Sequence, residues 1–390
     1  MVNNKVKLGS VCSFYSGTGF PLQYQGNTQG KYPFYKVGDI SRNYANGSRY
    51  LSDAEHYIDD EVLYTIKGQI IPANTVVFAK IGEAVKLNRR AITSQECLID
   101  NNATGIKPNE SQLDLDYFFH FMCQLKLEKY AEATTVPSVK KSSMEKLEIP
   151  LLPLNEQKEI AKILDKVTAL ISLRKKQLEK LDELVKSRFI EMFGDMIHNS
   201  NNWERVALGD VCDVRDGTHD SPKYYDEGYP LVTSKNVTGG IIDFTDCSLI
   251  CREDYEKINE RSKVDFGDIL MPMIGTVGKP IIVNVKCEFA IKNVALIKFC
   301  SDCKVINIFV KALLQSDYFD TSVLNKIRGG TQKFIALGDI RKLVFFLPPL
   351  ELQEQFATFV AQTDKSKLAV QKSLEQLETL KKSLMQKYFG

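Results

Sequence analysis

The side chains in this sequence that could do chemistry are mainly cations, amides and hydroxyls on segments of turn-like composition, and they fall into two sets. Arg, Lys, Asn and Gln form paired hydrogen bonds with base edges, whereas Ser, Thr and further cations suit phosphate oxygens. The pattern predicts a surface that reads DNA. The DNA-binding candidates are Thr18, Lys36, Lys80, Lys86, Arg89, Arg90 and Lys140 in the first half, and Thr218, His219, Lys235, Asn236, Lys279, Lys292, Gln332 and Lys333 in the second.

The sequence carries no convincing reaction machinery. Gly275-Thr-Val-Gly-Lys279 resembles a phosphate-binding loop, but it lacks the four-residue gap, and Pro280 follows the lysine. The four histidines show neither metal-ligand spacing nor a nucleophile partner. A glycine-rich methyl-donor loop is also missing. We therefore expect no catalysis, no catalytic residues and no cofactor in this chain.

The cysteines favour free thiols over a disulfide framework or a metal site. Nine are scattered along the chain, and an odd number fits a reducing compartment. Cys300-Ser-Asp-Cys303 with Cys247 and Cys251 could form a four-thiolate zinc site. That spacing is a weak signal, so we expect no metal.

Length and charge limit the range of functions. A chain of 390 residues with 44% apolar content suits two or three domains with proper cores. No signal-like start or uncharged apolar run of membrane-spanning length occurs, so we expect a cytoplasmic protein. The net charge of +2 is low for a protein that neutralises many phosphates alone. A DNA-binding chain of this kind needs focused basic patches or a partner that supplies positive surface.

A tandem duplication organises the chain. Pro153-Leu-Asn-Glu-Gln157 begins a long helical pattern, and Pro349-Leu-Glu-Leu-Gln353 begins a second one 196 residues later. A Gly-Thr pair near the start of each half, Gly17-Thr18 and Gly217-Thr218, repeats at a spacing of 200 residues. The repeat predicts two copies of a globular module followed by a long helix.

Apolar residues in both long helices recur at an average spacing of 3.5, which is typical of a coiled coil. Arg174 and Arg188 in the first helix match apolar Val370 and Leu384 in the second. This complementarity favours pairing within one chain; the alternative is that each helix lies separately on a globular body. The predicted seam consists of Ile160, Leu164, Val167, Ile171, Leu178, Leu181, Val185, Val360, Val370, Leu374, Leu377 and Leu384.

The fold class expected is α+β, with two duplicated mixed α/β domains separated by two long helices that form an antiparallel intramolecular coiled coil. Short apolar runs broken by Gly, Pro and Asn predict strands early in each module, and helices are expected only late in it. Ser142-Ser-Met-Glu145 predicts a capping box. The predicted segments are domain 1 at 1–152, spacer helix 1 at 153–194, domain 2 at 195–347 and spacer helix 2 at 348–390.

These motifs together resemble the specificity (S) subunit of Type I restriction-modification systems. The resemblance rests on the Pro-Leu-x-x-Gln helix entry, the Gly-Thr turns and the run Gly267-Asp-Ile-Leu-Met-Pro-Met-Ile-Gly-Thr-Val-Gly278, and it covers essentially the whole chain. The first module departs from it, with Ala79-Lys-Ile-Gly-Glu-Ala84 in the corresponding place.

The resemblance implies a non-catalytic subunit whose two domains each read one half of a bipartite, asymmetric DNA target. It implies that the long helices measure the unspecified gap and dock two methyltransferase (M) subunits, which use S-adenosylmethionine to methylate adenine. Restriction (R) subunits would add ATP-dependent and Mg-dependent cleavage. Two alternatives remain: a recognition subunit of another restriction-modification architecture, or a non-DNA scaffold with two duplicated binding modules.

Overall fold

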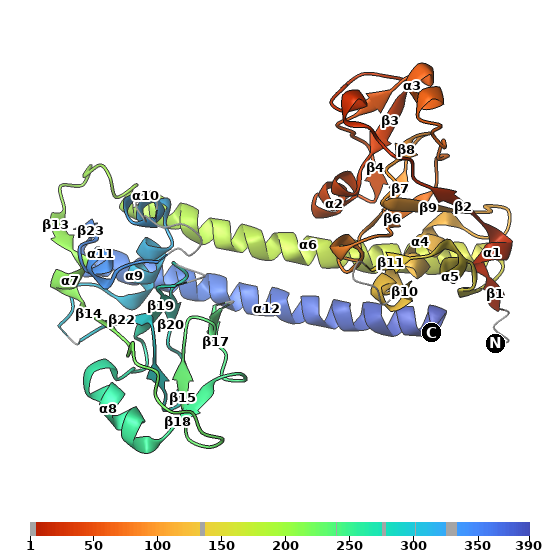
Figure 1. Cartoon of the computed structure of the whole chain (residues 1–390). Helices are drawn as coiled ribbons and strands as arrows, with labels where there is room; N and C mark the ends of the chain where they lie inside the picture. Colours follow the sequence, from red (N-terminus) through yellow and green to blue (C-terminus); the bar gives the residue numbers. More distant parts are fainter. Residues whose placement is uncertain (1–4, 133–136, 239, 275–277, 301, 325–333) are drawn as a thin grey trace. The chain divides into compact units, whose positions relative to one another are not determined.

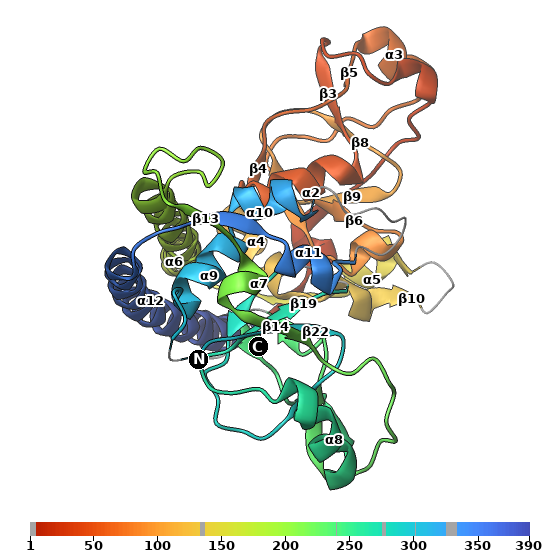
Figure 2. The ribbon, with the colours of Figure 1, turned by 90° about the vertical axis from the view of Figure 1, so that its left-hand side faces the viewer.

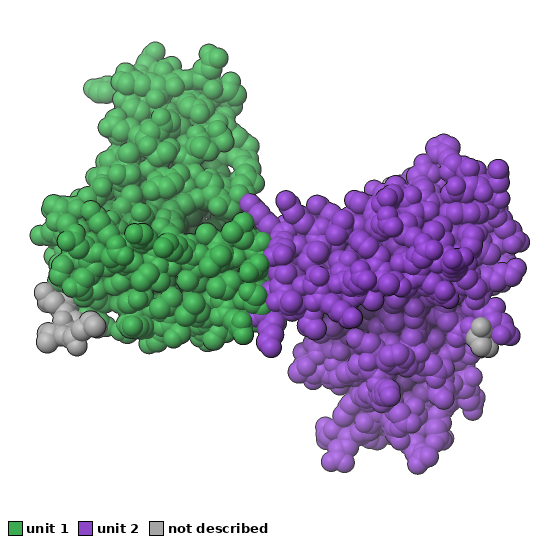
Figure 3. Space-filling view, turned by 180° about the vertical axis from the view of Figure 1, so that it is seen from behind, with its two compact units in different colours: residues 1–174, 373–390 green, residues 175–372 purple. Residues whose placement is uncertain are grey.

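The computed structural model describes residues 5–132, 137–238, 240–274, 278–300, 302–324 and 334–390. The chain forms two compact units, unit 1 with residues 1–174 and 373–390 and unit 2 with residues 175–372 (Figure 3). Each unit contains one globular module and part of both long helices, α6 at Leu154–Phe193 and α12 at Leu350–Phe389.

The two long helices pair in opposite directions within each unit (Figure 1). In unit 2 the ring of Phe189, near the end of α6, meets that of Phe356, near the start of α12, and Asp182 meets Lys367. In unit 1 the core contains both the start of α6 and the end of α12. The prediction of an antiparallel intramolecular pair is confirmed.

The seam residues named from the sequence are buried or half-buried along both helices, while most positions between them are exposed. Two of the polar seam positions bond across to the partner helix. Arg174 Nε donates to Ser373 Oγ at 3.2 Å in unit 1, and Lys367 Nζ lies 2.7 Å from Asp182 Oδ1 in unit 2. Arg174 and Lys367 are therefore matched by polar groups on the opposite helix, whereas Arg188 pairs with Glu191 of its own helix and lies over the ring of Phe359.

The module of unit 1 is built on a five-stranded sheet in the order β2-β9-β6-β7-β4, with a three-stranded sheet β5-β3-β8 beside it. The helices α4 and α5 lie on the side facing α6, whereas α3 lies near β3 and β5 at the far side (Figure 1 and Figure 2). The strands are β1 Lys5–Lys7, β2 Cys12–Ser16, β3 Tyr32–Tyr35, β4 Tyr50–Leu51, β5 Tyr57–Ile58, β6 Val76–Ala79, β7 Arg90–Thr93, β8 Leu98–Ile99, β9 Ala103–Pro108, β10 Ala131–Glu132, β11 Ser138–Val139 and β12 Glu148–Pro150. The helices are α1 Leu8–Val11, α2 Val37–Ala45, α3 Asp60–Thr65, α4 Leu115–Gln124 and α5 Lys141–Glu145, with short 3₁₀ turns η1 Leu22–Tyr24, η2 Glu83–Val85 and η3 Leu127–Tyr130.

The module of unit 2 repeats this plan with a four-stranded sheet β14-β22-β19-β20 and a three-stranded sheet β18-β15-β21. In both units, the strand entering the module pairs antiparallel with the strand that leaves it for the long helix. The strands are β13 Glu204–Ala207, β14 Asp213–Asp216, β15 Tyr229–Val232, β16 Val237–Thr238, β17 Ile241–Ile242, β18 Ser248–Ile250, β19 Ile269–Pro272, β20 Ile281–Ile282, β21 Ala290–Ile291, β22 Val294–Lys298 and β23 Val344–Leu347. The helices are α7 Leu208–Val211, α8 Arg252–Ser262, α9 Asn307–Leu314, α10 Asp317–Ser322 and α11 Leu337–Arg341.

The glutamine of the repeated helix entry explains why that motif recurs. Gln157 is fully buried; its Oε1 accepts from Asp114 N at 2.8 Å and its Nε2 donates to Gln112 O and Leu152 O. Gln353 makes the corresponding bonds with the backbone of Ile306, Lys304 and Pro348. A buried amide that satisfies three backbone groups ties the start of the long helix to the segment before α4 or α9.

Two details of the expected fold are wrong. Helices also occur before the central strands of each module, because α2 and α3 precede β6 in unit 1 and α8 precedes β19 in unit 2. The capping box at Ser142 is not formed, since α5 begins at Lys141 and its N-cap Lys140 makes no side-chain cap bond.

Candidate nucleic-acid interface

The Gly-Thr pair fixes the same loop in both units. A Cβ on Gly17 would lie 1.7 Å from Asp100 O, and one on Gly217 would lie 2.2 Å from Ile291 O, so both positions require glycine. This close approach lets Thr18 N donate to Ile99 O at 2.8 Å. Thr218 N donates to Ile291 O at 3.0 Å. The pair therefore anchors the chain after β2 and after β14 against the strand β8 or β21.

Both threonine hydroxyls also serve the loop conformation. Thr18 Oγ1 accepts from Gln69 N at 3.1 Å, and Thr218 Oγ1 accepts from Asp220 N at the same distance. Each oxygen retains a lone pair, and each residue is half-buried. The two threonines therefore hold the loop conformation, and each hydroxyl could still donate a hydrogen bond to a ligand.

In unit 1, a groove of about 270 Å³ brings together lysines and hydroxyls from segments far apart in the sequence. We call it the lysine groove. It lies over the junction of β2, β9 and β6 with the segment that leads into α5. Its lining residues are Phe14, Ser16, Lys80, Ile81, Thr104, Ile106, Ser138, Val139, Lys140, Lys141 and Met144.

The three lysines of the groove are held differently. Lys140 Nζ lies 2.6 Å from Glu132 Oε1, and Lys141 Nζ lies 3.6 Å from Glu145 Oε1. For Lys80 we find no side-chain hydrogen bond or ion pair among the described residues, although its backbone accepts from Val139 N. Ammonium and hydroxyl groups around one concave surface are suited to phosphate oxygens.

Unit 2 has the same backbone at this place but different side chains. The bridges Ile81 to Ser138 and Ile274 to Phe334 correspond, as do the strand pairs β6-β9 and β19-β22. The correspondence aligns Lys80 with Met273, and the remaining polar groove residues with non-basic ones. Ser16, Thr104, Ser138 and Lys140 align in turn with Asp216, Ala295, Phe334 and Ala336.

The polar groups of unit 2 gather instead around the buried carboxylate of Asp216. His219 Nε2 lies 2.8 Å from Asp216 Oδ2, and His219 Nδ1 lies 2.8 Å from Asn293 Oδ1. Arg261 forms an ion pair with the other Asp216 oxygen. The bonds to Asn293 and Asp216 raise the pKa of His219, because both ring nitrogens face acceptors. The cluster thus presents an exposed imidazole that favours its cationic form.

The remaining candidates of unit 1 occupy varied environments. Lys36 Nζ donates to Gln25 Oε1 at 2.7 Å, and Lys86 pairs with Glu83 at 2.8 Å. The Arg89 guanidinium lies over the ring of Tyr44. Arg90 is 3% exposed and donates to the backbone oxygens of Asn88 and Leu125, so its charge is used inside the module.

In unit 2, Asn236 is buried, and its amide holds Thr233 and Asp243 within a turn. Lys292 Nζ donates to Ser221 Oγ at 2.5 Å, whereas Lys235 and Lys279 are exposed. Gln332 and Lys333 lie outside the described residues.

Sequence reasoning did not select Ser16, Thr104 and Ser138, which complete the lysine groove. It also missed Asp216 and Arg261, which hold His219. The strand register was the missing signal. Ser16 pairs with Thr104 across β2 and β9, and this pairing brings their side chains to the groove. Pairing partners of short strands cannot be read from the periodicity of a single strand.

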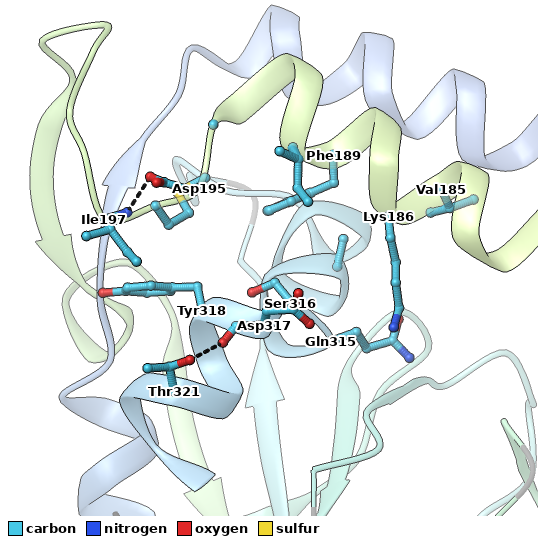
Figure 4. Close-up of a pocket in the computed structure, with 14 residues that line it drawn as sticks. Val185, Lys186, Phe189, Asp195, Ile197, Gln315, Ser316, Asp317, Tyr318 and Thr321 are labelled. Carbon is cyan, nitrogen blue, oxygen red and sulfur yellow. Dashed lines mark hydrogen bonds between the residues drawn. The ribbon is translucent and has the colours of Figure 1, made fainter. Parts of the chain in front are cut away.

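An apolar cavity of about 200 Å³ in unit 2 has a different character (Figure 4). Phe189 and Val185 of α6, Ile197 of the following segment and Tyr318 of α10 face it. Asp195 lies at its edge, where its carboxylate accepts from the backbone N of Ile197 at 2.9 Å. Such walls suit an apolar group and not a phosphate.

Two further properties concern the described part of the chain. No group of three or more His, Cys, Asp and Glu there is arranged to hold a metal ion. Its helices also lack the combination of length and apolar character that a membrane span needs.

Comparison with known proteins identifies the family. The model for the type I restriction modification DNA specificity domain matches residues 2–183 and again 200–379. The chain belongs to this specificity family. It is a type I restriction-modification specificity subunit with a tandem duplication of the family domain.

Individual relatives agree with this assignment. The MjaVIII specificity subunit of Methanocaldococcus jannaschii is 30% identical over 292 residues, which cover 69% of this chain and 68% of the relative. The EcoBI specificity subunit of Escherichia coli is 21% identical over 422 residues, covering 99% and 85%.

Solved structures of the specificity family share the fold. The S subunit of M. genitalium superposes with a TM-score of 0.57 at 15% identity, covering 100% of this chain and 98% of that one. A chain from a study of complex assembly and conformational transition of the type I R-M system gives a TM-score of 0.59 at 19% identity, covering 99% and 97%.

Proposed function

We propose that each unit of this specificity subunit reads one half of a bipartite, asymmetric DNA target. The observation that supports this is the contrast between a shared frame and unlike polar surfaces. The Gly-Thr anchors and the buried glutamines correspond in both units, whereas Lys80 and Lys140 correspond to Met273 and Ala336. Two copies with equal surfaces would read equal half-sites; two unlike surfaces suit unlike half-sites.

In unit 1 we assign the lysine groove to the DNA backbone. Lys80 is the central contact, because its ammonium has no competing ion pair in the described residues and hydroxyls of Ser16, Thr104 and Ser138 line the same groove. Lys140 and Lys141 keep acidic neighbours at 2.6 and 3.6 Å, which a phosphate would have to displace. Phosphate contacts fix the register of a protein on the duplex and leave base reading to neighbouring loops.

In unit 2 we assign the contact to the exposed edge of the Asp216 cluster. His219 and Arg261 both bond Asp216, so two cationic donors are held next to one another on the surface. Lys235, Lys279 and Lys292 are further candidates on the loops of this unit. Cationic donors of different shape from those of unit 1 would select different DNA positions.

We further propose that the subunit has no catalytic activity and acts in the cytoplasm with two M subunits and with R subunits. The M subunits would bind S-adenosylmethionine, and the R subunits would bind ATP and Mg. The net charge of +2 supports a division of labour in which partner subunits provide most of the positive surface around the duplex. We propose that the helices α6 and α12 dock the M subunits and that their length sets the unspecified gap between the two halves of the DNA target.

The test uses the full chain assembled with its M subunits and a duplex carrying the methylated target. Lys80→Gln should weaken binding about five- to tenfold near 0.1 M salt and lower the salt slope by about 0.9, the value for one phosphate. The base preference of the second half-site should not change. Methylome sequencing and binding titrations between two salt concentrations measure these quantities.

Lys263→Gln in unit 2 is the matched control, because Lys263 is an exposed lysine that already pairs with Asp265 at 3.9 Å. Its salt slope should stay at the wild-type value. An unchanged slope for Lys80→Gln would remove the lysine groove from the DNA contact. Loss of preference in both half-sites would contradict reading by separate units.

A further inference from the structure

Two cysteines of unit 2, Cys300 and Cys303, face each other in the segment between β22 and α9. The Cys300 and Cys303 sulfur atoms are 2.8 Å apart, and Cys303 N donates to Cys300 O at 3.2 Å. Cys300 is exposed and Cys303 is half-buried. A bond from the fourth residue of a turn back to the first keeps their Cα atoms within about 7 Å. Disulfides span Cα separations of about 4.4 to 6.8 Å, so the backbone already permits a bond.

The same turn exists in unit 1 without any cysteine. Asn109 Oδ1 accepts from Ser111 N and Ser111 Oγ, at 3.2 and 2.8 Å, and Gln112 N donates to Asn109 O at 2.9 Å. In unit 1 the buried glutamine holds the carbonyl of Gln112, the last residue of the turn, and in unit 2 it holds that of Lys304, one residue after Cys303. The frame therefore needs the turn but not the thiols, and the thiols of unit 2 require another explanation.

We propose that Cys300 and Cys303 are a redox-active dithiol that is oxidised to an intrachain disulfide by small disulfides such as oxidised glutathione. The Cys300 thiolate attacks one sulfur of the oxidant and expels the first thiolate, which leaves a mixed disulfide. The deprotonated Cys303 sulfur then attacks Cys300 Sγ and expels the second thiolate. The protein loses two protons and two electrons, and the oxidant is reduced to two thiols.

The surroundings assign the order of the two cysteines. The exposed Cys300 sulfur is accessible to the oxidant, whereas burial raises the pKa of Cys303 and makes its thiolate less abundant. Cys303 therefore suits the second, intramolecular step, in which the local sulfur concentration is high. Cys212, which lies near both, is buried, and burial raises the pKa of its thiol as well. A small oxidant has no direct access to Cys212.

The disulfide is expected to restrict the segment of unit 2 that leads into α9. The turn leads through Ile306, whose backbone N donates to Gln353 Oε1 at 3.0 Å, into α9 with Phe309 in the core. A covalent bond across the turn reduces the freedom of this segment in the unfolded chain. We expect slower hydrogen exchange in residues 304–314 of the oxidised protein, and no change around Asn109 in unit 1.

The experiment titrates the full chain with defined ratios of reduced and oxidised glutathione, alkylates the remaining thiols and identifies the peptides by mass spectrometry. The expected product is a peptide with Cys300 linked to Cys303, lighter by two hydrogen atoms and released by reductant. Cys303→Ser should stop at the mixed disulfide with glutathione on Cys300. Cys287→Ser, which removes another exposed cysteine, should leave the product unchanged.

A double variant, Cys300→Asn with Cys303→Gln, copies the residues of unit 1 and guards against an effect of misfolding. It should fold like the reduced wild type and show no oxidant-dependent exchange. Persistence of the mixed disulfide in the wild type would overturn the proposal, as would a bond between Cys300 and Cys212. Free thiols in excess oxidised glutathione would overturn it too.

Discussion

The two units keep the same hydrogen bonds that support their backbone but differ in the side chains of the proposed DNA-binding surface. This contrast separates the residues needed for folding from those proposed for recognition. Gln157 and Gln353 make matching sets of three hydrogen bonds, and Gly17 and Gly217 both stand where a side chain would collide with backbone. In the groove, by contrast, the lysines Lys80 and Lys140 of unit 1 correspond to Met273 and Ala336 of unit 2, and Ser16 corresponds to the carboxylate of Asp216. After a duplication, residues that satisfy buried backbone groups are the costly ones to change. Surface residues of the same strands are free to diverge.

The attachment of each module to the long helices differs as well. In unit 1, Arg49 bonds Asp116 of α4 and Asp165 of α6, and His120 also bonds Asp165. In unit 2 the positions of Asp165 and His120 are occupied by alanines, Ala361 and Ala312. Both units also pack rings at this junction: in unit 1 Phe389 of α12 contacts Tyr117 and Phe121 of α4. Unit 2 has a larger cluster, which consists of Phe189, Phe193, Phe309 and Phe356. Unit 1 therefore adds a polar junction to its ring contacts, whereas unit 2 has a larger apolar junction in its place.

The largest loss of stability is expected from a substitution in the apolar junction of unit 2. Phe356→Ala should lower the free energy of unfolding by about 3–5 kcal/mol, because a fully buried ring is replaced by a cavity. Its counterpart in unit 1 is Ile160, a smaller side chain that is 8% exposed, so Ile160→Ala should cost about 2–3 kcal/mol. Urea unfolding measures both changes, and hydrogen exchange assigns each to its unit. A larger loss for Ile160→Ala would reverse the comparison.

Replacing the buried glutamine should lower the free energy of unfolding by the same amount in both units. Gln157→Leu and Gln353→Leu each leave one backbone N–H and two carbonyls without their partner, and we expect a loss of about 2–3 kcal/mol in either case. Gln→Glu at the same sites is a useful companion, since it keeps one acceptor but removes the donor. Chemical unfolding of the single variants is sufficient. A difference above about 1 kcal/mol between the units would show that the frame is not equivalent.

The sequence was enough to predict the parts of the structure that follow a long period. The two 40-residue helices, their opposite pairing and the Pro-Leu-x-x-Gln entry could be predicted because apolar spacing and a duplicated motif persist over many residues. The short helix α8 could not, since Arg252–Ser262 is almost entirely polar and buries only Ser262 fully. A local pattern of this kind resembles a loop until the neighbouring sheet is known.

The candidate site shows the same limit at the level of single residues. Lys80 and Lys140 were named from their residue type, and the structure brings both to one groove. Arg90 was named for the same reason, yet it is buried because β7 lies inside the five-stranded sheet and the guanidinium bonds Leu125 O. Residue type indicates what a side chain can bind, whereas the strand pairing decides which surface it reaches.

The smallest effect that we expect concerns the pKa shifts of two histidines, which have opposite signs. Burial lowers the pKa of His120 in unit 1, although Asp165 opposes this, whereas the bonds to Asn293 and Asp216 raise the pKa of His219 in unit 2. The stability linked to His120 is therefore present above its ordinary pKa of about 6.5 and decreases as the pH falls through that value. The stability linked to His219 is present below about 6.5 and is lost as the pH rises through its folded pKa.

NMR titration of the two imidazoles, assigned with His120→Gln and His219→Gln, measures both shifts in one sample. Because His219 is exposed, its contribution to stability should stay below about 1 kcal/mol and decrease with added salt. The His120 shift should resist salt, since the ring is 3% exposed between α4 and α6. Midpoints on the same side of 6.5 would mean that the polar junction of unit 1 and the Asp216 cluster of unit 2 do not differ electrostatically as their geometry requires.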